Sequence, residues 1–524
     1  MSHADPAGEV LRECALSGVS EYVVCAGARN AAIVLPLLQQ TQYPVYHHFE
    51  ERSAGFFALG RVKQKREPVA VVTTSGTAAA ELLPAIIEAH YEGVPVVAIT
   101  ADRPAAYRGT GAPQAIEQVG LFGDYVESCI DVREGVVPQV AETWSRRAPL
   151  HWNVCLEEPT EEYLPVRWPG EASAKGGDRP RPDLFGNRVL SAFCADDEGL
   201  LVLAGPLAAG DVEEVEAFLR KLGAPILAEA ASNLRELASL SGLVLQGGEG
   251  ALKRLRISKV LRLGGVPSFR FWRDLEGRTE IEVMSILSGG FPGLARESVC
   301  LAHDWDDDPS PSFPERKAEP FDNRDGGLTE ILRKHRRSEP SMLRRLSEVI
   351  PRGASIFLGN SLAIREWNLA AAYEFRQFSY HANRGANGID GIVSSFLGVA
   401  AGEAEAWLIC GDLTALYDLA GLWIADQLPP GRRRIVVINN RGGRIFDRLP
   451  AFTKAAAAER EFIGNDHVLD FTGWANMWGW KHFAVADSEG FVDAVDDPHR
   501  HVLIEATPDP SQTEEFWKEW EARQ

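Results

Sequence analysis

Two apolar runs in the last quarter of the chain each end in a polar motif, and this pairing most constrains the fold. The run 406–410 is followed by Gly411-Asp412-Leu413, and the run 435–438 is followed by Asn439-Asn440-Arg441-Gly442-Gly443. Short apolar runs of this kind are typical of buried parallel strands. In an open α/β sheet the carboxyl ends of the strands form the crevice where ligands bind. A carboxylate and a carboxamide at that edge can together hold Mg²⁺ with a diphosphate.

Similar apolar runs occur along the whole chain and divide it into three blocks. The runs lie at 22–25, 69–73 and 94–99, then at 201–203, 259–263 and 281–283, and then at 355–358, 406–410, 435–438 and 502–505. Segments long enough for helices separate them, including a helical pattern over 211–222, and this alternation is typical of parallel α/β sheets. We therefore predict the α/β fold class, with three parallel-sheet domains.

Two stretches read as domain boundaries, at 165–182 and at 304–327. The first is rich in glycine, proline and charge, and the second contains Asp306-Asp307-Asp308-Pro309-Ser310-Pro311, where charge repulsion and repeated prolines oppose both helix and strand. A chain of 524 residues with 45% apolar content is also too long for a single core. We predict domains at 1–168, 183–303 and 328–524.

Charge and cysteine content exclude several classes of partner. A net charge of −20 argues against nucleic acid or an anionic membrane surface as the main partner, and anionic substrates would need locally placed arginines. Seven scattered cysteines without a Cys-x-x-Cys pair suit a reducing cytoplasm better than a disulfide framework. The opening residues 1–5 have no targeting pattern, and no apolar run approaches the roughly 20 residues needed to span a bilayer. We expect a cytoplasmic protein without membrane insertion.

Further polar motifs each allow two local interpretations. Glu50-Glu51 opens a helix-like run, where a glutamate can simply favour the helix dipole or can serve chemistry. Thr74-Ser75-Gly76-Thr77-Ala78 follows a predicted strand and begins an alanine-rich helix, so it can cap that helix or present amides and a hydroxyl to a ligand. Arg365 and Arg384 stand among Gly, Asn and Ser residues near predicted strand ends. They can be surface cations, or they can bind carboxylates bidentately.

Taken together, these motifs resemble the thiamine diphosphate enzymes, whose signature is Gly-Asp-Gly followed about one crossover helix later by Asn-Asn. Within that family the chain is similar to the menaquinone-pathway synthases, which often lack the last glycine of the signature, where this chain has Leu413. The segments that carry this similarity are 51–122, which includes Thr100-Ala101-Asp102-Arg103-Pro104, then 359–365, 382–391 and Arg444-Ile445-Phe446. The resemblance implies a pyrimidine-binding domain, a central domain and a diphosphate-binding domain.

The resemblance also implies thiamine diphosphate with Mg²⁺ or Mn²⁺ as cofactors. Glu51 would be the catalytic residue, since the family places a glutamate there that hydrogen-bonds the aminopyrimidine ring and takes part in the proton exchange that activates the cofactor. An apolar neighbourhood would raise the pKa of this glutamate. A helix starting near Leu416 would add phosphate donors. The other implied cofactor residues are Thr77, Ile389 (the apolar prop under the cofactor), Leu413, Thr414, Asn440 and Gly442, and the implied metal ligands are Asp412, Asn440 and the Gly442 carbonyl. A buried isoleucine is usually only core, so the role of Ile389 rests wholly on the resemblance.

The substrates implied by the resemblance are 2-oxoglutarate and isochorismate, which carry two carboxylates each. The residues assigned to them are Arg29, Arg103, Arg365 and Arg384 for carboxylates, Gln114 and Ser361 as polar partners, and Ile445, Phe446 and Leu449 as pocket lining. The expected reaction decarboxylates 2-oxoglutarate and adds the succinyl unit to isochorismate, giving 2-succinyl-5-enolpyruvyl-6-hydroxy-3-cyclohexene-1-carboxylate. A related enzyme for another 2-oxo acid and a non-catalytic assembly subunit are the alternatives. The family's active sites lie between subunits, so a homodimer or homotetramer is expected.

Two departures from the family pattern fall on the substrate side. Cys25-Ala26-Gly27-Ala28-Arg29-Asn30 stands where the synthases usually read Cys-Pro-Gly-Ser-Arg-Ser, so a serine hydroxyl is missing at Ala28. Gly-Ala-Asn-Gln becomes Gly111-Ala112-Pro113-Gln114, which removes a carboxamide and stiffens the loop. A lost hydrogen bond to a charged group costs about 1.5 to 3 kcal/mol, enough to shift substrate preference. The basic cluster 431–434 is predicted to be a solvated turn without a role.

Overall fold

The computed structural model of the chain describes residues 6–133, 137–157, 188–195, 199–286, 290–301, 321, 325–449, 452 and 454–523. They form two compact parts. The first is Met1–Asp178 with Gly385–Glu403 and Tyr417–Pro430, and the second is Arg179–Arg384 with Ala404–Leu416 and Gly431–Gln524. The predicted boundary 165–182 and most of 304–327 lie outside the described residues, so the three domain limits stay a prediction.

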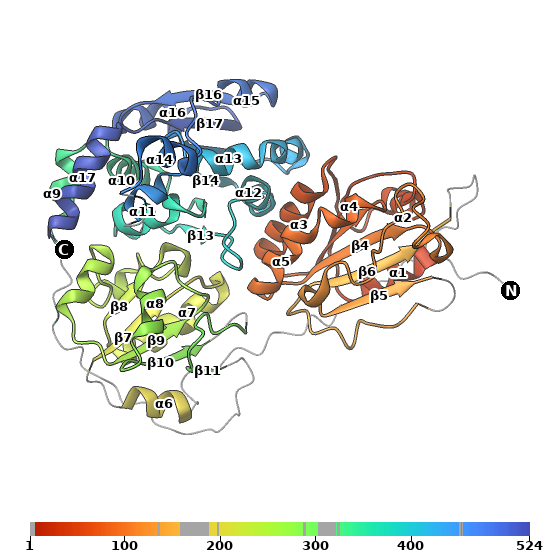
Figure 1. Cartoon of the computed structure of the whole chain (residues 1–524), viewed down its shortest axis with the longest axis horizontal. Helices are drawn as coiled ribbons and strands as arrows, with labels where there is room; N and C mark the ends of the chain where they lie inside the picture. Colours follow the sequence, from red (N-terminus) through yellow and green to blue (C-terminus); the bar gives the residue numbers. More distant parts are fainter. Residues whose placement is uncertain are drawn as a thin grey trace. The chain divides into compact units, whose positions relative to one another are not determined.

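The described strands form three sheets in which all pairings are parallel, and this confirms the predicted α/β class (Figure 1). The sheet of the first part has the order β2-β1-β3-β4-β6-β5. Its strands are β1 Glu21–Val24, β2 Val45–His47, β3 Val69–Thr73, β4 Val96–Asp102, β5 Ser128–Val132 and β6 Leu150–Cys155.

Helix α3 (Glu51–Lys65) contacts β1, β3 and β4 of this sheet and packs tightly on α12 (Ile392–Ala400). The two helix backbones touch, because a Cβ added at Gly398 would lie 2.3 Å from the Phe57 carbonyl oxygen and 2.8 Å from the Gly60 Cα. Only glycine permits this approach. The remaining helices of the first part are α1 Pro6–Leu16, α2 Ala31–Gln39, α4 Thr77–Ala80, α5 Leu83–Glu92, η1 Ala105–Tyr107, η2 Gly123–Tyr125 and η8 Leu419–Gln427.

The second part contains two sheets. The central one has the order β11-β10-β9-β7-β8, and the C-terminal one has the order β13-β12-β14-β15-β17-β16. The central strands are β7 Leu200–Ala204, β8 Ile226–Ala228, β9 Lys259–Leu263, β10 Glu282–Ile286 and β11 Val299–Leu301. The C-terminal strands are β12 Ser355–Leu358, β13 Ser379–His381, β14 Glu405–Gly411, β15 Arg432–Ile438, β16 Lys481–Val485 and β17 His501–Ala506.

The first and the C-terminal sheets share one strand order, in which the second strand lies on one side of the first and the later strands lie on the other. Each sheet therefore has a switch point, between β1 and β3 in one and between β12 and β14 in the other, where a ligand crevice is expected. The core of the C-terminal sheet includes the fully buried Trp367 and Trp407. This shared topology depends on the order of the strands in each sheet, which the structure shows.

The helices of the second part connect and cover its sheets (Figure 1). They are α6 Arg188–Ala195, α7 Val212–Leu222, α8 Arg270–Asp274, α9 Leu328–Lys334, α10 Glu339–Val349, α11 Leu362–Ala370, α13 Asp412–Tyr417, α14 Ala457–Gly464, α15 Thr472–Met477, α16 Phe491–Asp496 and α17 Pro510–Arg523. The shorter 3-10 helices are η3 Ala209–Asp211, η4 Ala230–Ser232, η5 Ala238–Leu240, η6 Gly248–Arg254, η7 Leu275–Gly277, η9 Arg444–Arg448 and η10 Ser488–Gly490. The predicted helix over 211–222 is confirmed to within one residue as α7.

The prediction of a solvated turn at 431–434 is wrong. Strand β15 begins at Arg432, and both Arg433 and Arg434 are fully buried. The two terminal nitrogens of the Arg434 guanidinium donate to the carbonyl oxygens of His499 and Asp497 at 2.9 and 2.8 Å, so backbone acceptors hold this side chain inside the protein. Burial, with the nearby charge of Arg432, lowers the pKa of Arg434 to about 10.

All seven cysteines are free, as expected from their scattered positions. Across the part of the chain that the structure describes, no helix is both long and apolar enough to cross a membrane.

Candidate active site

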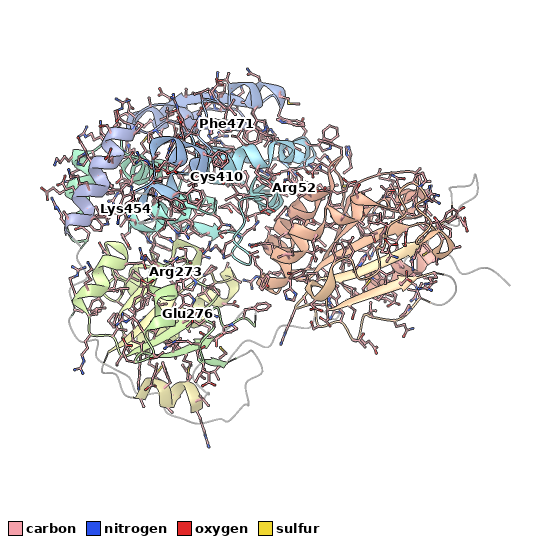
Figure 2. All side chains as sticks on the ribbon, in the orientation of Figure 1. Arg52, Arg273, Glu276, Cys410, Lys454 and Phe471 are labelled. Carbon is pink, nitrogen blue, oxygen red and sulfur yellow. The ribbon has the colours of Figure 1, made fainter. Side chains whose placement is uncertain are left out.

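Two neighbouring strand ends of the C-terminal sheet, next to its switch point, bring the two opening motifs together. Strand β14 leads from the fully buried Cys410 into Gly411 (Figure 2), and β15 leads into Asn439-Asn440. Helix α13 begins at Asp412 itself, so the expected helix start near Leu416 is four residues too late. Strand and helix are therefore continuous at Asp412, and the predicted phosphate donors Leu413 and Thr414 lie in the first turn of α13.

The Asp412 carboxylate links the two strand ends. Its Oδ1 accepts a hydrogen bond from the Leu413 amide at 2.6 Å, and its Oδ2 accepts one from the Gly442 amide at 2.9 Å. The Nε2 atom of His467 lies 3.3 Å from the same Oδ2. Burial raises the pKa of Asp412 in spite of these donors. Each Asp412 oxygen can accept a further contact, so this buried carboxylate is suited to binding a cation.

Asn440 supplies a second oxygen at this edge of the sheet. Its Nδ2 donates to Glu339 Oε2 at 2.9 Å, whereas its Oδ1 is buried and has no hydrogen-bond partner among the described residues. Native proteins rarely leave a buried acceptor unsatisfied. An orphan carboxamide oxygen near a carboxylate fits a hard cation, which prefers oxygen ligands.

Gly442 completes the predicted ligand set. It has φ +137°, and a Cβ there would lie 2.7 Å from the Gly464 carbonyl oxygen, so the position needs glycine. Its own carbonyl accepts from the Arg444 amide at 3.0 Å and keeps a second lone pair. The described residues contain no cluster of three or more His, Cys, Asp or Glu side chains that could hold a metal. The predicted set includes only one such side chain, and its oxygens fit Mg²⁺ or Mn²⁺.

Behind Asn440 lies a buried pair of carboxyl groups that the sequence did not reveal. Glu339 opens α10, Glu366 lies on α11, and both are nearly inaccessible to solvent. Burial raises the pKa of Glu339, and burial together with the charge of Glu339 raises that of Glu366 well above its usual range. Glu366 is therefore the protonated partner, while Glu339 accepts from Asn440. In the sequence, Ser338-Glu339-Pro340 looks only like a helix start.

Replacing Glu339 with methionine is expected to lower the affinity for divalent metal about tenfold. The substitution removes the Glu339 carboxylate, which accepts from the Asn440 amide nitrogen and so turns the Asn440 oxygen the other way. Glu366 stays neutral because its pKa is raised. The measurement is a Mn²⁺ titration followed by electron paramagnetic resonance. Glu366→Gln is the matched control, since it changes the neighbouring buried carboxyl group and leaves the Asn440–Glu339 hydrogen bond in place, and its metal affinity should equal that of the unmodified protein. Equal affinities in all three proteins would contradict this role of Glu339.

Two predicted substrate arginines lie near this edge on the second part. Arg384 follows β13 and donates from Nη1 to Asn360 Oδ1 at 2.8 Å, while Asn360 donates to the Asn383 carbonyl at 2.9 Å. Arg365 was predicted to lie at a strand end, but it lies one turn into α11, because the chain turns into that helix directly after β12. Its Nη1 donates to the carbonyl of Ser361, at 2.6 Å.

The geometry around these arginines suits an anionic ligand. Ser361 has φ +68°, a conformation that costs a non-glycine residue energy and is common at functional sites. Desolvation, followed by repulsion from the charge of Arg384, lowers the pKa of Arg365. A ligand with carboxylates would relieve that repulsion. The role of Asn360, which orients Arg384, was missed, although it stands next to Ser361 in the motif.

The predicted pocket residues follow the Asn440 motif closely. Ile445 and Phe446 lie on η9 and are partly buried, and Leu449 comes directly after it with 37% of its surface exposed. The Phe446 ring meets that of Phe452 edge to face, with centroids 5.8 Å apart. These side chains form an apolar segment on the same loop as the metal motif, and their contact with substrate stays a prediction.

In the first part, the structure separates the roles of the two adjacent glutamates. Glu50 caps α3, because its carboxylate accepts from the amides of Arg52 and Ser53 at 3.1 and 3.0 Å. Glu51 is thus not needed as the cap. Burial, with the charges of Glu50 and Glu81 adding to it, raises the pKa of Glu51, and this confirms the expected direction. A carboxyl group with a raised pKa is suited to proton exchange near neutral pH.

The turns after β1 and β3 lie against each other. A Cβ added at Gly27 would lie 2.8 Å from the Cβ of Thr74, so the turn that leads to Arg29 touches the Thr74–Thr77 turn. Arg29 is 9% exposed and donates from Nη1 to the Leu156 carbonyl at 3.2 Å. Helix α4 starts at Thr77, which confirms that the motif begins an alanine-rich helix.

The loop after β4 carries the other predicted substrate residues of the first part. Arg103 donates from Nε to the Pro113 carbonyl at 2.7 Å, and Gln114 has the left-handed φ of +59°. Proline retains the carbonyl oxygen that Arg103 uses, so the departure at Pro113 leaves this contact intact. Arg103 and Gln114 are thereby held on one loop.

Ile389 lies in the first part, on a loop that is anchored at both ends. Glu88 on α5 accepts from the amides of Gly385 and Ala386, both at 2.7 Å, and Gly391 lies so close to the Phe56 ring of α3 that an added Cβ would overlap it. Ile389 is partly buried between these anchors. Glu88 had no sequence signal, because a glutamate on an amphipathic helix usually faces solvent.

The predicted residues therefore form two groups. The first part holds Glu51, Thr77, Arg29, Arg103, Gln114 and Ile389, and the second part holds Asp412, Leu413, Thr414, Asn440, Gly442, Ser361, Arg365, Arg384, Ile445, Phe446 and Leu449. Apart from Ile389, which lies on the loop before α12, the residues of each group follow strands of a parallel sheet whose strand order reverses.

Known proteins with similar sequences carry related names. The family model described as thiamine pyrophosphate enzyme, N-terminal TPP binding domain, matches residues 7–121. The 2-succinyl-5-enolpyruvyl-6-hydroxy-3-cyclohexene-1-carboxylate synthase of Bdellovibrio bacteriovorus is 38% identical over 99% of this chain and 99% of its own. The proteins of the same name from Akkermansia muciniphila and Bacillus velezensis are 38% and 33% identical. They cover 97% and 95% of this chain and 96% and 93% of their own length.

Proposed function

Because this chain belongs to the family of 2-succinyl-5-enolpyruvyl-6-hydroxy-3-cyclohexene-1-carboxylate synthases, we propose that it decarboxylates 2-oxoglutarate and adds the remaining four-carbon unit to isochorismate. The assignment to this family from sequence motifs is confirmed, as is the thiamine diphosphate dependence that it implied. The observation that carries the proposal is the 38% identity over 99% of both chains.

Bound thiamine diphosphate supplies the electron sink for loss of CO₂ and for carbon–carbon bond formation. The protein's contribution begins with binding. The Asp412 carboxylate, the Asn440 oxygen and the Gly442 carbonyl would hold Mg²⁺ or Mn²⁺ together with the diphosphate. The unsatisfied Asn440 Oδ1 supports this assignment. Thr77, Leu413 and Thr414 would add polar contacts, and Ile389 would support the cofactor from its apolar side.

Glu51 would exchange a proton with the aminopyrimidine ring. Two observations support this role, namely that Glu50 already caps α3 and that burial raises the pKa of Glu51. A carboxyl group freed from the helix cap and kept partly out of water can hold or release a proton near neutral pH.

The substrates would be held by charge complementarity. Four carboxylates on two substrates call for several cations, and the structure offers Arg29, Arg103, Arg365 and Arg384 at or near strand ends in the two parts, with Gln114 and Ser361 as polar partners. Planar guanidinium groups bind carboxylates in a defined orientation. Ile445, Phe446 and Leu449 would form an apolar wall that excludes water from the reacting atoms.

The test mixes purified protein, thiamine diphosphate, Mg²⁺ and 2-oxoglutarate, with and without isochorismate. The expected result is loss of isochorismate with equimolar release of CO₂ and a product mass equal to isochorismate plus the four-carbon unit. Pyruvate in place of 2-oxoglutarate should give no adduct, because it has one carboxylate to offer the arginines. Cofactor binding without an adduct would contradict the proposal and direct a screen of other 2-oxo acids, to which the changes at Ala28 and Pro113 would then be relevant.

A homodimer or homotetramer, with active sites between subunits, is part of the same proposal. Association through Phe462, Val468 and Met477 on the second part would remove apolar surface from water, because these side chains are 86%, 87% and 75% exposed. Analytical ultracentrifugation is expected to give the mass of at least two chains, and Val468→Glu should shift the protein toward one chain. A single-chain mass for the unmodified protein would contradict it.

A further inference from the structure

Gln118 is a fully buried carboxamide in the first part, and no motif had pointed to it. Its Oε1 accepts from the Gly76 amide at 2.8 Å, and its Nε2 donates to the Ala101 carbonyl at 3.1 Å and to Asn153 Oδ1 at 2.9 Å. One side chain thus joins the turn after β3, the body of β4 and the neighbouring strand β6. These three segments are adjacent in the sheet, but they are far apart in the sequence.

The loop that carries Gln118 also touches the Thr74–Thr77 turn directly. We call this the cofactor turn, because Thr77 is a predicted cofactor residue. A Cβ added at Gly76 would lie 3.1 Å from the Cα of Gln114, and Gly76 has φ +82°. Gln114 itself has φ +59°, an uncommon conformation that persists only where its surroundings hold it. The cofactor turn before Thr77 and the substrate residue Gln114 are therefore neighbours, and Gln118 is the hydrogen-bonded link between their loops.

The link continues to the second substrate residue of this loop. Asn153 Nδ2 donates to Asp102 Oδ2 at 3.1 Å, and Asp102 Oδ1 accepts from the Arg103 amide at 2.8 Å. Arg108 bridges Asp102 and the carboxylate of Asp131 at 2.8 and 2.7 Å. The loop is thus tied at Arg103, where it leaves β4, and again at Gln118.

From these contacts we propose that Gln118 is a positioning residue that sets the loop carrying Arg103 and Gln114 against the cofactor turn at Gly76. The proposal rests on the function proposed above. Gln118 touches neither substrate nor cofactor in this scheme, and it acts through the residues that do.

The chemistry of a carboxamide explains why this position selects one arrangement. The Gly76 amide faces it as a donor, whereas Ala101 and Asn153 face it as acceptors. A flipped amide would oppose donor to donor on one side and acceptor to acceptor on the other, and buried mismatches of that kind are costly. Only one orientation of the Gln118 carboxamide therefore satisfies all three groups. An apolar residue satisfies none of the three groups, while a protonated glutamic acid can still accept from Gly76 and donate to Asn153.

The experiment compares Gln118→Met, Gln118→Glu and the matched control Glu117→Met, which changes the exposed neighbouring residue on the same loop. The Michaelis constants for both substrates, kcat, thiamine diphosphate affinity and hydrogen exchange of the peptides spanning 74–78 and 111–118 are measured in each. For Gln118→Met, the expected results are faster exchange in those two peptides and a rise of about tenfold or more in KM for one substrate, with kcat changed much less. That substrate should be the one whose KM also rises in Gln114→Ala.

Gln118→Glu is the conservative rescue. Burial raises the pKa of such a carboxyl group, so it is protonated at low pH and keeps the link, and it loses the link as the pH rises through that raised value. Its KM should therefore match that of the unmodified protein at low pH and increase with pH, a dependence that the unmodified protein lacks. This pH dependence of KM tests the proposal even if Gln118→Met does not fold.

Three outcomes would overturn the proposal. They are unchanged exchange of both peptides in Gln118→Met, equal effects in Gln118→Met and Glu117→Met, or a KM increase for a substrate other than the one affected by Gln114→Ala. Hydrogen exchange and cofactor affinity need no turnover. The unmodified protein could make no adduct while hydrogen exchange of the two peptides still accelerates in Gln118→Met and not in Glu117→Met. In that case the proposed reaction is wrong, but the role of Gln118 in holding the loop against the cofactor turn stands.

Discussion

Glu51→Gln is expected to lower kcat by about 10² to 10⁴, the range in which a positioned acid or base contributes to enzymatic proton transfer. Glutamine has the size of glutamate and can still form a hydrogen bond, but it cannot exchange a proton with the aminopyrimidine ring. Thermal stability and thiamine diphosphate affinity should stay close to those of the unmodified protein. The measurements are steady-state formation of the adduct, and cofactor binding by tryptophan fluorescence.

Glu50→Gln is the matched control, because it makes the same chemical change one residue earlier. Glu50 caps α3, so its replacement should lower the free energy of unfolding by about 1 kcal/mol and leave kcat within about threefold of the unmodified protein, since it removes a cap and not the proton exchange. If Glu51→Gln kept most of its activity, Glu51 would not be the activating residue. Inactivity of the unmodified protein, with the cofactor bound, would favour the non-catalytic alternative.

The second large effect is expected for Asp412→Asn, which should weaken binding of thiamine diphosphate with Mg²⁺ about a hundredfold or more. This loss exceeds the usual loss of metal affinity when a residue that only orients a metal ligand is replaced. Asparagine can still accept from the Gly442 amide, so the link between β14 and β15 survives. What is lost is the only carboxylate of the predicted ligand set, and with it the charge that attracts a divalent cation. Isothermal titration calorimetry measures the loss directly, without turnover.

Asp426→Asn provides the surface control, because Asp426 is exposed in the first part. It should bind cofactor and metal like the unmodified protein. The effect of Asp412→Asn should also exceed that of Glu339→Met, since Glu339 acts only by orienting Asn440. Cofactor affinity within about threefold of normal in Asp412→Asn would show that the metal is held elsewhere, because the predicted set has no other charged ligand.

Much of the architecture follows from local patterns. The apolar runs at 69–73, 406–410 and 435–438 are strands because buried parallel strands need continuous apolar residues on both faces. The polar motifs after the last two runs come to one edge because all strands of a parallel sheet end on the same side. Strand β6 (Leu150–Cys155) was not predicted, since the buried His151 and Asn153 interrupt its apolar pattern.

The errors share a physical origin. Arg433 and Arg434 look like solvated residues by hydropathy, yet the terminal nitrogens of Arg434 donate inside the protein to the carbonyls of His499 and Asp497, which no window around residue 434 includes. The start of α13 at Asp412 was placed four residues late, because Gly411-Asp412 reads locally as a loop. At Asp412 too a distant backbone group takes part, since the Gly442 amide donates to its carboxylate.

By itself, the sequence determined the α/β class, the family and the motif residues at the strand ends, because these depend on residue type and short spacing. Only the tertiary structure decided that Glu50 is the cap and leaves Glu51 available, that Asn440 Oδ1 has no partner within the described residues, and that Glu339 and Gln118 orient their neighbours. The last two contacts join residues 101 and 42 positions apart. Strand order brings such residues together, and neither helical nor strand periodicity encodes that order.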